Sequence, residues 1–412
     1  MNVEVLYNNS LEKVKIEDAS ILDVLSPSIV ETCDERNIVE NAILNPINAQ
    51  SFAEFLGKEE DVLVIVNDAT KPSPTAKILE YIEPFLKFEK TKFLVATGTH
   101  RAPTEEELDQ IFGRFFRGRV FIHDSKKEDD MVFLGKTSRN TEVKINQLAI
   151  EASKILLIGS AEPHYFAGFT GGRKAIIPGI AGFQTIEQNH SLALEKEAIS
   201  LKLKGNPIHD DIVEGIGFLK KDIFSIQAVL DHERRICFVA AGDLYDSHAN
   251  AVEKAKQLFT VSAKGKADIV VAVVKPPWDI NFYQSQQAVE NAKFILKDSG
   301  ILILVSACLN GLGGGHYYSI MSSCSNPEGI GKNISKENYK LGAHKAKRFA
   351  ELLVKSDLWA VTKLQGSEIK KMFMTPYDNI QKAVDDAFAK KGKNAKISFL
   401  LDGATTVPVI KG

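Results

Sequence analysis

The 412-residue sequence lacks the features that would place it in a membrane, in a disulfide-bonded secreted fold or on nucleic acid. No apolar run approaches the roughly 20 residues that span a bilayer, and the N-terminus has neither the basic start nor the apolar core of a signal peptide. A net charge of −2 leaves no basic excess for neutralising phosphates. The cysteines, Cys33, Cys237, Cys308 and Cys324, form no CxxC pair. We expect a soluble, cytoplasmic protein with reduced thiols and no membrane or nucleic-acid partner.

Common cofactor signatures are missing as well. The chain has no GxGxxG dinucleotide fingerprint, no GxxxxGK[ST] P-loop and no HExxH metal motif. The first absence argues against a dehydrogenase that uses a diffusible nicotinamide, and the last against a metal site built from protein ligands alone. A small anionic substrate is still compatible with the net charge, because binding it needs only one or two local cations.

What is present is an ordinary globular composition, 44% apolar and 25% charged, at a length where two domains are expected. A helix-like segment passes into a new strand near residues 255–266. We therefore place an N-terminal α/β domain at residues 1–260 and a C-terminal α/β domain at 261–412. Whether the final segment, TTVPVIKG, packs back on the first domain is an open question at this point.

The fold class follows from short runs rich in Val and Ile that alternate with amphipathic segments. Such runs are typical of strands buried on both faces of a parallel sheet. They lie at 61–68, 92–100, 119–125, 154–164, 223–230, 236–243, 267–275, 300–308, 358–364 and 396–403. Helices are predicted at 104–116, after a Thr104–Glu107 capping box, and at 284–296. We predict two α/β domains with mostly parallel sheets and the active site in the cleft between them.

Three of the predicted strands end in a titratable residue: Asp68 after LVIVN, His100 after LVATGT and His164 after LIGSAEP. In open α/β sheets, functional groups gather in loops beyond the carboxyl ends of the strands. These residues therefore predict one site built by several loops, although strand ends are polar in many proteins. Two histidines there suit general acid–base catalysis, whereas a single histidine is more often structural.

Two glycine-rich segments each have a functional and a structural interpretation. In GFTGGRK, Gly171 and Gly172 permit positive φ, so that their amides can face an anion, and Lys174 adds a cation; a plain loop is the alternative. In GLGGGH (311–316), a sharp backbone turn is the favoured cause, and a bound ligand is the alternative.

Two further candidates are less specific. Asp68 and Lys71, in NDATKPSP, follow a buried strand, where an ordinary capped turn is an equally good explanation. His190, in TIEQNH, is a candidate metal ligand, but no second close histidine or carboxylate cluster accompanies it. Any metal at His190 must take most of its ligands from elsewhere.

Together these segments resemble the nickel-dependent lactate racemase family, in the family's order and over most of the chain. The matching segments are NDATKPSP (67–74), GTHRAPTEEEL (98–108), EPHYFAGFTGGRKAIIPGI (162–180), TIEQNH (185–190), GNPIHDDIVE (205–214) and WDINFYQSQQAVENA (278–292).

The resemblance implies a cofactor, a pyridinium mononucleotide whose sulfur groups hold nickel in a pincer. Matched motif by motif, the residue that tethers it covalently is Lys174, and the protein's nickel ligand is His190. Thr170 and the amides of Gly171 and Gly172 would lie near the nucleotide phosphate. Separate maturation enzymes make this cofactor, so a preparation from a host that lacks them would carry none.

The resemblance also implies that His100 and His164 are the acid–base pair and that Asp68 is another cofactor-side residue. Removing the Cα proton of a 2-hydroxy acid is difficult beside a carboxylate. Removal as hydride is easier when a base takes the hydroxyl proton and an electron-poor cofactor accepts the hydride. One base for each enantiomer accounts for two histidines.

Substrate contacts depart from the family pattern. Lys71 stands where the family has arginine, and Gln284 is followed by Gln287 where the family has lysine. A lysine is a point charge rather than a bidentate fork, and the second change removes a cation. Trp359 matches a family active-site tryptophan. We predict a racemase or epimerase of another 2-hydroxy acid, such as a sugar acid, malate or a larger hydroxy acid; the alternative is a non-catalytic protein of the same fold that binds a nucleotide or nickel cofactor.

Overall fold

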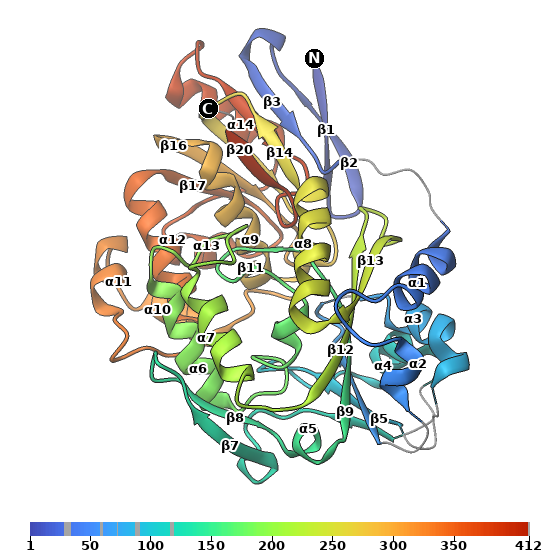
Figure 1. The fold of residues 1–412 in the computed structure, drawn as a ribbon. Helices are drawn as coiled ribbons and strands as arrows, with labels where there is room; N and C mark the ends of the chain where they lie inside the picture. The colour runs from blue at the N-terminus through green and yellow to red at the C-terminus, as the bar shows by residue number, and fades with distance from the viewer. Residues whose placement is uncertain (29–33, 58–60, 72, 87–90, 116–118, 411–412) are drawn as a thin grey trace. The chain divides into compact units, whose positions relative to one another are not determined.

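The computed structural model describes residues 1–28, 34–57, 61–71, 73–86, 91–115 and 119–410 (Figure 1). The chain divides into two compact units. The middle unit comprises residues 29–258, and the terminal unit comprises residues 1–28 together with 259–412. The predicted α/β class is confirmed, because each unit contains a six-stranded, mostly or wholly parallel sheet with helices. Among the described residues, no helix is long and apolar enough to cross a membrane.

The sheet of the middle unit has the order β13-β12-β9-β4-β5-β6. Its strands are β4 (Val62–Asn67), β5 (Thr91–Ala96), β6 (Arg119–Ile122), β9 (Lys154–Ser160), β12 (Asp222–Leu230) and β13 (Ile236–Asp243). All neighbours are parallel except β12 and β13, which form an antiparallel pair because only five residues separate them. Two hairpins are added, β7 (Met131–Lys136) with β8 (Glu142–Asn146) and β10 (Pro163–His164) with β11 (Gly168–Phe169).

Helices of the middle unit are α1 (Glu35–Leu44), α2 (Phe52–Leu56), α3 (Thr75–Ile82), α4 (Glu105–Phe112), α5 (Gln147–Glu151), α6 (Phe183–Ser191), α7 (Pro207–Ile216) and α8 (Leu244–Phe259). The first four pack on one face of the sheet, where Val64, Val66 and Phe93 belong to a continuous buried core. The capping box of Thr104 and Glu107 at the start of α4 is confirmed. On the opposite face, the short 3-10 helix η6 (Gly172–Ala175) contacts β4, β9 and β12, so the predicted tether lies against the centre of the sheet.

The sheet of the terminal unit has the order β18-β17-β16-β15-β19-β3 and is parallel throughout. Its strands are β3 (Ile21–Leu25), β15 (Ala267–Val273), β16 (Leu296–Val305), β17 (Asp357–Val361), β18 (Thr375–Tyr377) and β19 (Ile397–Leu400). Residues 1–28, which we assigned from sequence to the N-terminal domain, thus contribute an edge strand to this sheet. The final strand β20 (Val407–Ile410) pairs with β14 (Thr260–Ala263) inside the same unit.

The N-terminal hairpin joins β1 (Asn2–Tyr7) to β2 (Ser10–Lys15) through Asn8 and Asn9, both of which have positive φ. The hairpin shares a core with the sheet and with α14. Helices of this unit are α9 (Phe282–Ala292), α10 (Gly315–Ser322), α11 (Pro327–Asn333), α12 (Ala343–Lys355), α13 (Gly366–Lys371) and α14 (Ile380–Lys391). Cys237, Cys308 and Cys324 are free thiols, and Cys33 lies outside the described residues.

Candidate functional site

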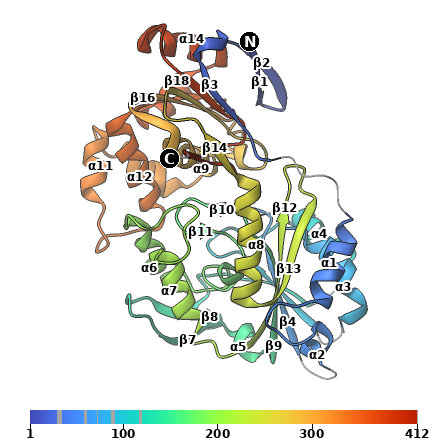
Figure 2. The ribbon, with the colours of Figure 1, turned by 45° about the horizontal axis from the view of Figure 1, so that its top comes forward.

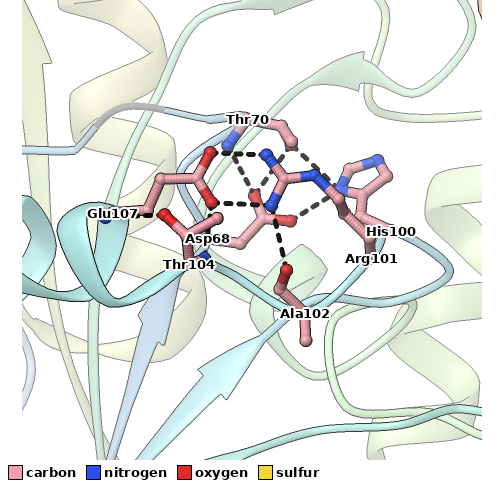
Figure 3. A network of polar contacts seen from close by, with 7 residues as sticks. All are labelled: Asp68, Thr70, His100, Arg101, Ala102, Thr104 and Glu107. Atoms are coloured by element: carbon pink, nitrogen blue, oxygen red, sulfur yellow. Dashed lines mark hydrogen bonds and ion pairs between the residues drawn. The ribbon is translucent and has the colours of Figure 1, made fainter.

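The predicted meeting of strand ends is observed for Asp68 and His100. β4 lies between β5 and β9, so the loops that carry Asp68, His100 and His164 leave adjacent strands. Nδ1 of His100 lies 2.7 Å from an Asp68 carboxylate oxygen and 2.9 Å from the Thr70 hydroxyl (Figure 3). That hydroxyl itself donates to Asp68 over 2.8 Å. Asp68, expected on the cofactor side, is therefore a direct partner of His100.

The Asp68 carboxylate is buried yet ionised. Burial opposes its charge, but the hydrogen bond and charge of His100, the charge of Lys71 and the Thr70 hydroxyl outweigh that effect and lower the pKa of Asp68. A carboxylate only accepts hydrogen bonds, so Nδ1 of His100 carries the proton that points at it. The other ring nitrogen, Nε2, is then left with its lone pair, which is the arrangement that a base needs.

The loop after His100 is held by an exposed ion pair. Arg101 donates to both oxygens of Glu107 at 2.7 Å and 2.6 Å, and to the Ala102 carbonyl at 2.9 Å (Figure 3). Glu107 also caps α4 through the Thr104 amide. The segment THRAPTEEE thus uses local side-chain bonds to fix the backbone that presents His100.

Three predicted site residues, His164, His190 and Lys174, lie around the ring of Phe166. Its ring centroid lies 4.5 Å from that of His164 and 5.2 Å from that of His190, both edge-to-face. The Lys174 amine lies 5.3 Å from the same centroid. Nδ1 of His164 accepts from the Ala167 amide at 3.3 Å. The two predicted bases, His164 and His100, therefore have different partners: a backbone N–H for one and a carboxylate for the other.

The glycine pair is required by packing within the protein. Gly171 and Gly172 have φ of 79° and 50°. A Cβ on Gly171 would lie 2.6 Å from Gln227 Oε1, and one on Gly172 would lie 2.8 Å from the His248 side chain. The Gly172 amide donates to Gln227 Oε1 at 2.7 Å. Thr170, predicted near a phosphate, donates its hydroxyl to the Ser160 carbonyl.

Gln227 and His248 were not identified from the sequence. Gln227 is fully buried in β12, and His248 on α8 is within 2.8 Å of the Thr170 carbonyl and 3.1 Å of Arg173. The amide in the mostly apolar strand IFSIQAVL was a signal for the first, since a polar group in a strand buried on both faces needs a specific partner. His248 lies in an ordinary amphipathic helix and gave no signal.

Three basic side chains of the middle unit influence one another: Arg173 and Lys174 are buried, and Lys71 is partly buried. Lys174 is 6% exposed, and burial, followed by the charges of Lys71 and Arg173, puts its pKa well below the ordinary lysine value. Burial likewise lowers the pKa of Lys71 and takes that of Arg173 to about 9. Burial and the charges of Lys174 and Lys71 lower the pKa of His190 to about 3, so its imidazole is neutral, as a metal ligand must be.

These features fit an anionic cofactor that brings its own metal donors. Two buried nitrogens, Arg173 Nε and His209 Nδ1, have no hydrogen-bond partner among the residues described. Within the same part of the chain, no group of three or more His, Cys, Asp or Glu residues can hold a metal ion. A metal at His190 therefore needs ligands from a bound group, and a negative group would offset the cluster of Lys71, Arg173 and Lys174.

The other candidates belong to the terminal unit. Gln284 lies in the first turn of α9. Gln287 donates to the Ala404 carbonyl at 2.6 Å, so its amide holds a neighbouring loop. Trp359 lies in the middle of β17, 5% exposed, and stacks on Tyr377 with ring centroids 5.1 Å apart, as a core residue does.

The GLGGGH segment is explained by close packing on the start of α9. A Cβ on Gly313 would lie 2.7 Å from the Asn281 side chain, and one on Gly314 would lie 2.5 Å from the Tyr283 ring. Both glycines have positive φ. The favoured interpretation, a sharp backbone turn, accounts for these glycines.

Fold and site together define an α/β protein with a carboxylate–histidine pair and a buried lysine beside a second histidine. Residues 7–201 match the lactate racemase N-terminal domain, and residues 262–409 match the lactate racemase C-terminal domain. The chain belongs to the lactate racemase family.

Individual relatives agree with this assignment. Lactate racemase of Thermoanaerobacterium thermosaccharolyticum is 29% identical, with 98% of this chain and 99% of the relative covered. That of Lactiplantibacillus plantarum is 30% identical, with 90% of each covered. The structure of the T. thermosaccharolyticum lactate racemase apoprotein has a TM-score of 0.92 over 99% of this chain and all of its own, at 29% identity. A Thermotoga maritima protein shares the fold, with a TM-score of 0.70 at 18% identity over 92% of this chain and 98% of its own.

Proposed function

We propose that this protein is a racemase or epimerase of a 2-hydroxy acid, and that it uses a tethered nickel-pincer nucleotide. Membership of the lactate racemase family supports the isomerase class. The observation that carries the proposal for this chain is the grouping of Lys174, His190 and His164 around Phe166.

The chain's own residues hold the cofactor in this proposal. Lys174 provides the amine for the covalent tether, and its burial lowers the pKa of that amine, which favours the nucleophilic neutral form. His190 provides the neutral imidazole ligand for nickel. When bound, the group supplies an electron-poor acceptor for hydride.

His100 has the stronger case for a base. Asp68 fixes the tautomer of its ring, which leaves Nε2 to take the substrate hydroxyl proton and stabilises the imidazolium that results. His164 is the proposed counterpart for the opposite enantiomer. Lys71, next to Asp68 in the same loop, is the proposed cation for the substrate carboxylate.

The substrate is proposed to be a 2-hydroxy acid other than lactate. Lys71 gives a single point charge, and Gln287 is engaged with Ala404, so neither supplies a bidentate or additional cationic contact. Gln284 remains as a hydrogen-bonding group suited to extra hydroxyls, as in a sugar acid; malate and larger hydroxy acids are the other candidates.

The test uses protein matured together with its cofactor-making enzymes. Single-enantiomer lactate, malate, aldonic acids and larger 2-hydroxy acids are incubated separately, and chiral chromatography follows the opposite enantiomer. We expect turnover of a non-lactate acid, with His100→Ala inactive. Turnover of lactate alone would refute the altered substrate. A loaded protein that converts no acid would support a non-catalytic carrier, and formation of free NADH would indicate a dehydrogenase.

A further inference from the structure

The segment GNPIHDDIVE (205–214) begins α7, which carries none of the proposed tether, nickel-ligand or acid–base residues. Its start is encoded locally: Gly205 has φ of 73°, Asn206 caps the helix by accepting from the Ile208 amide at 3.0 Å, and Pro207 occupies the first turn. Two buried polar side chains, the N-cap Asn206 and Asp211 in the helix, make contacts beyond what capping requires, so their partners are informative.

Asn206 binds the loop that carries Phe166. The residue is fully buried, and its side-chain nitrogen donates to the Phe166 carbonyl at 2.8 Å and to the Lys202 carbonyl at 3.1 Å. Since Lys174, His164 and His190 all lie against the Phe166 ring, this bond fixes the position of their shared neighbour.

Asp211 binds the helix that carries His190. Its carboxylate, 2% exposed, accepts from three neutral donors. Thr137 donates to one oxygen at 2.6 Å, while Thr141 and Asn189 both donate to the other at 2.8 Å. Thr137 and Thr141 belong to the β7–β8 connection, whereas Asn189 directly precedes His190 on α6. α6 and α7 lie side by side (Figures 1 and 2).

The unpaired amide oxygen of Asn189 also indicates that the bond between Asn189 and Asp211 is important. Its side chain is completely buried, and its amide oxygen has no hydrogen-bond partner within the described part of the chain. A buried acceptor without a hydrogen-bond partner is unfavourable. What stabilises Asn189 in this position is the hydrogen bond from its amide nitrogen to Asp211. Asn189 directly precedes His190, the proposed nickel ligand.

We propose that α7 is the positioning element of the site: Asn206 holds Phe166, and Asp211 holds Asn189, so that one helix sets the spacing between the Lys174 amine and the His190 ring. This inference rests on the proposed function, because it assigns nickel to His190. Groups that orient a metal ligand from behind commonly change metal affinity by about 10- to 100-fold when removed.

A matched pair of variants separates positioning from stability. Asn189→Ala and Thr141→Val each remove one 2.8 Å bond to the same Asp211 oxygen, and Asn189→Ala also removes a 3.4 Å contact with the Ile208 carbonyl. Only Asn189 lies on α6, the helix that carries His190. In protein matured with its cofactor, nickel is measured per tethered cofactor during exposure to a chelator. We expect about tenfold faster nickel release from Asn189→Ala, and release from Thr141→Val at the wild-type rate.

Asp211→Asn is the conservative variant, since its amide oxygen still accepts from Asn189; it should release nickel at a rate between those of wild type and Asn189→Ala. Equal release from Asn189→Ala and Thr141→Val would overturn the proposal. A second readout needs no cofactor: the His190 ring resonance in histidine-labelled protein should shift in Asn189→Ala and stay unchanged in Thr141→Val. If wild-type protein acquires no tethered cofactor, the proposed function fails, while this resonance still tests the contact between α7 and α6.

Discussion

The two six-stranded sheets have similar architecture but present different chemistry at the carboxyl ends of their strands. In the middle unit, β4, β5 and β9 lead to Asp68, His100 and His164. In the terminal unit, β16 leads to neutral groups that bond to one another and to α9: Ser306 lies 2.7 Å from the Ser285 hydroxyl and accepts from the Cys308 thiol at 3.3 Å. Burial raises the pKa of Cys308, which keeps this thiol protonated.

The difference shows that the architecture provides a place for a site, and that loop residues decide whether chemistry occurs there. In the middle unit, buried cations and a carboxylate–histidine pair remain available to a ligand. In the terminal unit, amides and hydroxyls are used to join α9 to the sheet and its loops. Substitutions in the two units should therefore separate chemistry from stability.

The largest effect is expected for Lys174→Ala. Without the amine no covalent tether forms, so intact mass should show no cofactor-sized increment after maturation, and racemisation should be lost completely. Lys71→Ala is the control in the same cluster, and it should keep the increment while raising KM. An increment that persists in Lys174→Ala would refute the tether.

Asp68→Asn should lower kcat about 100-fold, because the neutral amide neither selects the His100 tautomer nor stabilises its protonated ring. Initial rates with saturating substrate measure the effect. Glu107→Gln weakens the surface ion pair with Arg101, while its amide oxygen can still accept from the Thr104 amide, and should change kcat less than threefold. A similar loss in both variants would mean that Asp68 acts on loop structure alone.

In the terminal unit, Gln287→Ala should cost about 1 kcal/mol of unfolding free energy, because it leaves the Ala404 carbonyl only the longer, 3.4 Å bond from Asn291. Urea denaturation of cofactor-free protein measures this. Gln284→Ala, one turn earlier on α9, should cost less than about 0.5 kcal/mol, since its side chain makes no hydrogen bond to other described residues. It should instead raise KM. The reverse pattern would make Gln287 the substrate contact.

The smallest effect concerns pH. Burial, then the charge of Arg173, lowers the pKa of His209 to about 4, against about 6.5 in an unfolded chain. Above pH 6.5 the His209 imidazole is neutral in both the folded and the unfolded chain, so it does not make stability depend on pH. Between pH 6.5 and 4 only the unfolded chain binds the proton, so stability falls as pH decreases, by about 1 kcal/mol per unit or less. His209→Gln should flatten this slope in thermal melts at pH 5–7; an unchanged slope would contradict the assignment.

Local patterns in the sequence were sufficient for much of this protein. Apolar runs predicted strands because burial on both faces leaves no polar alternation, and Thr104 with Glu107 predicted the start of α4 because capping is a local interaction. Strand-end polarity predicted the meeting of Asp68 and His100, since parallel neighbours end at one edge. The motif order indicated the family.

Contacts between distant segments required the tertiary structure. No local rule pairs residues 21–25 with 397–400, so the N-terminal strand was assigned to the other domain. Gln227 and His248, which enclose the glycine pair, come from residues more than fifty positions away, and Asp211 reaches Asn189 from the next helix. Propensity and periodicity act over a few residues, whereas burial and hydrogen bonding across the fold decide which polar groups are engaged and which are left for a ligand.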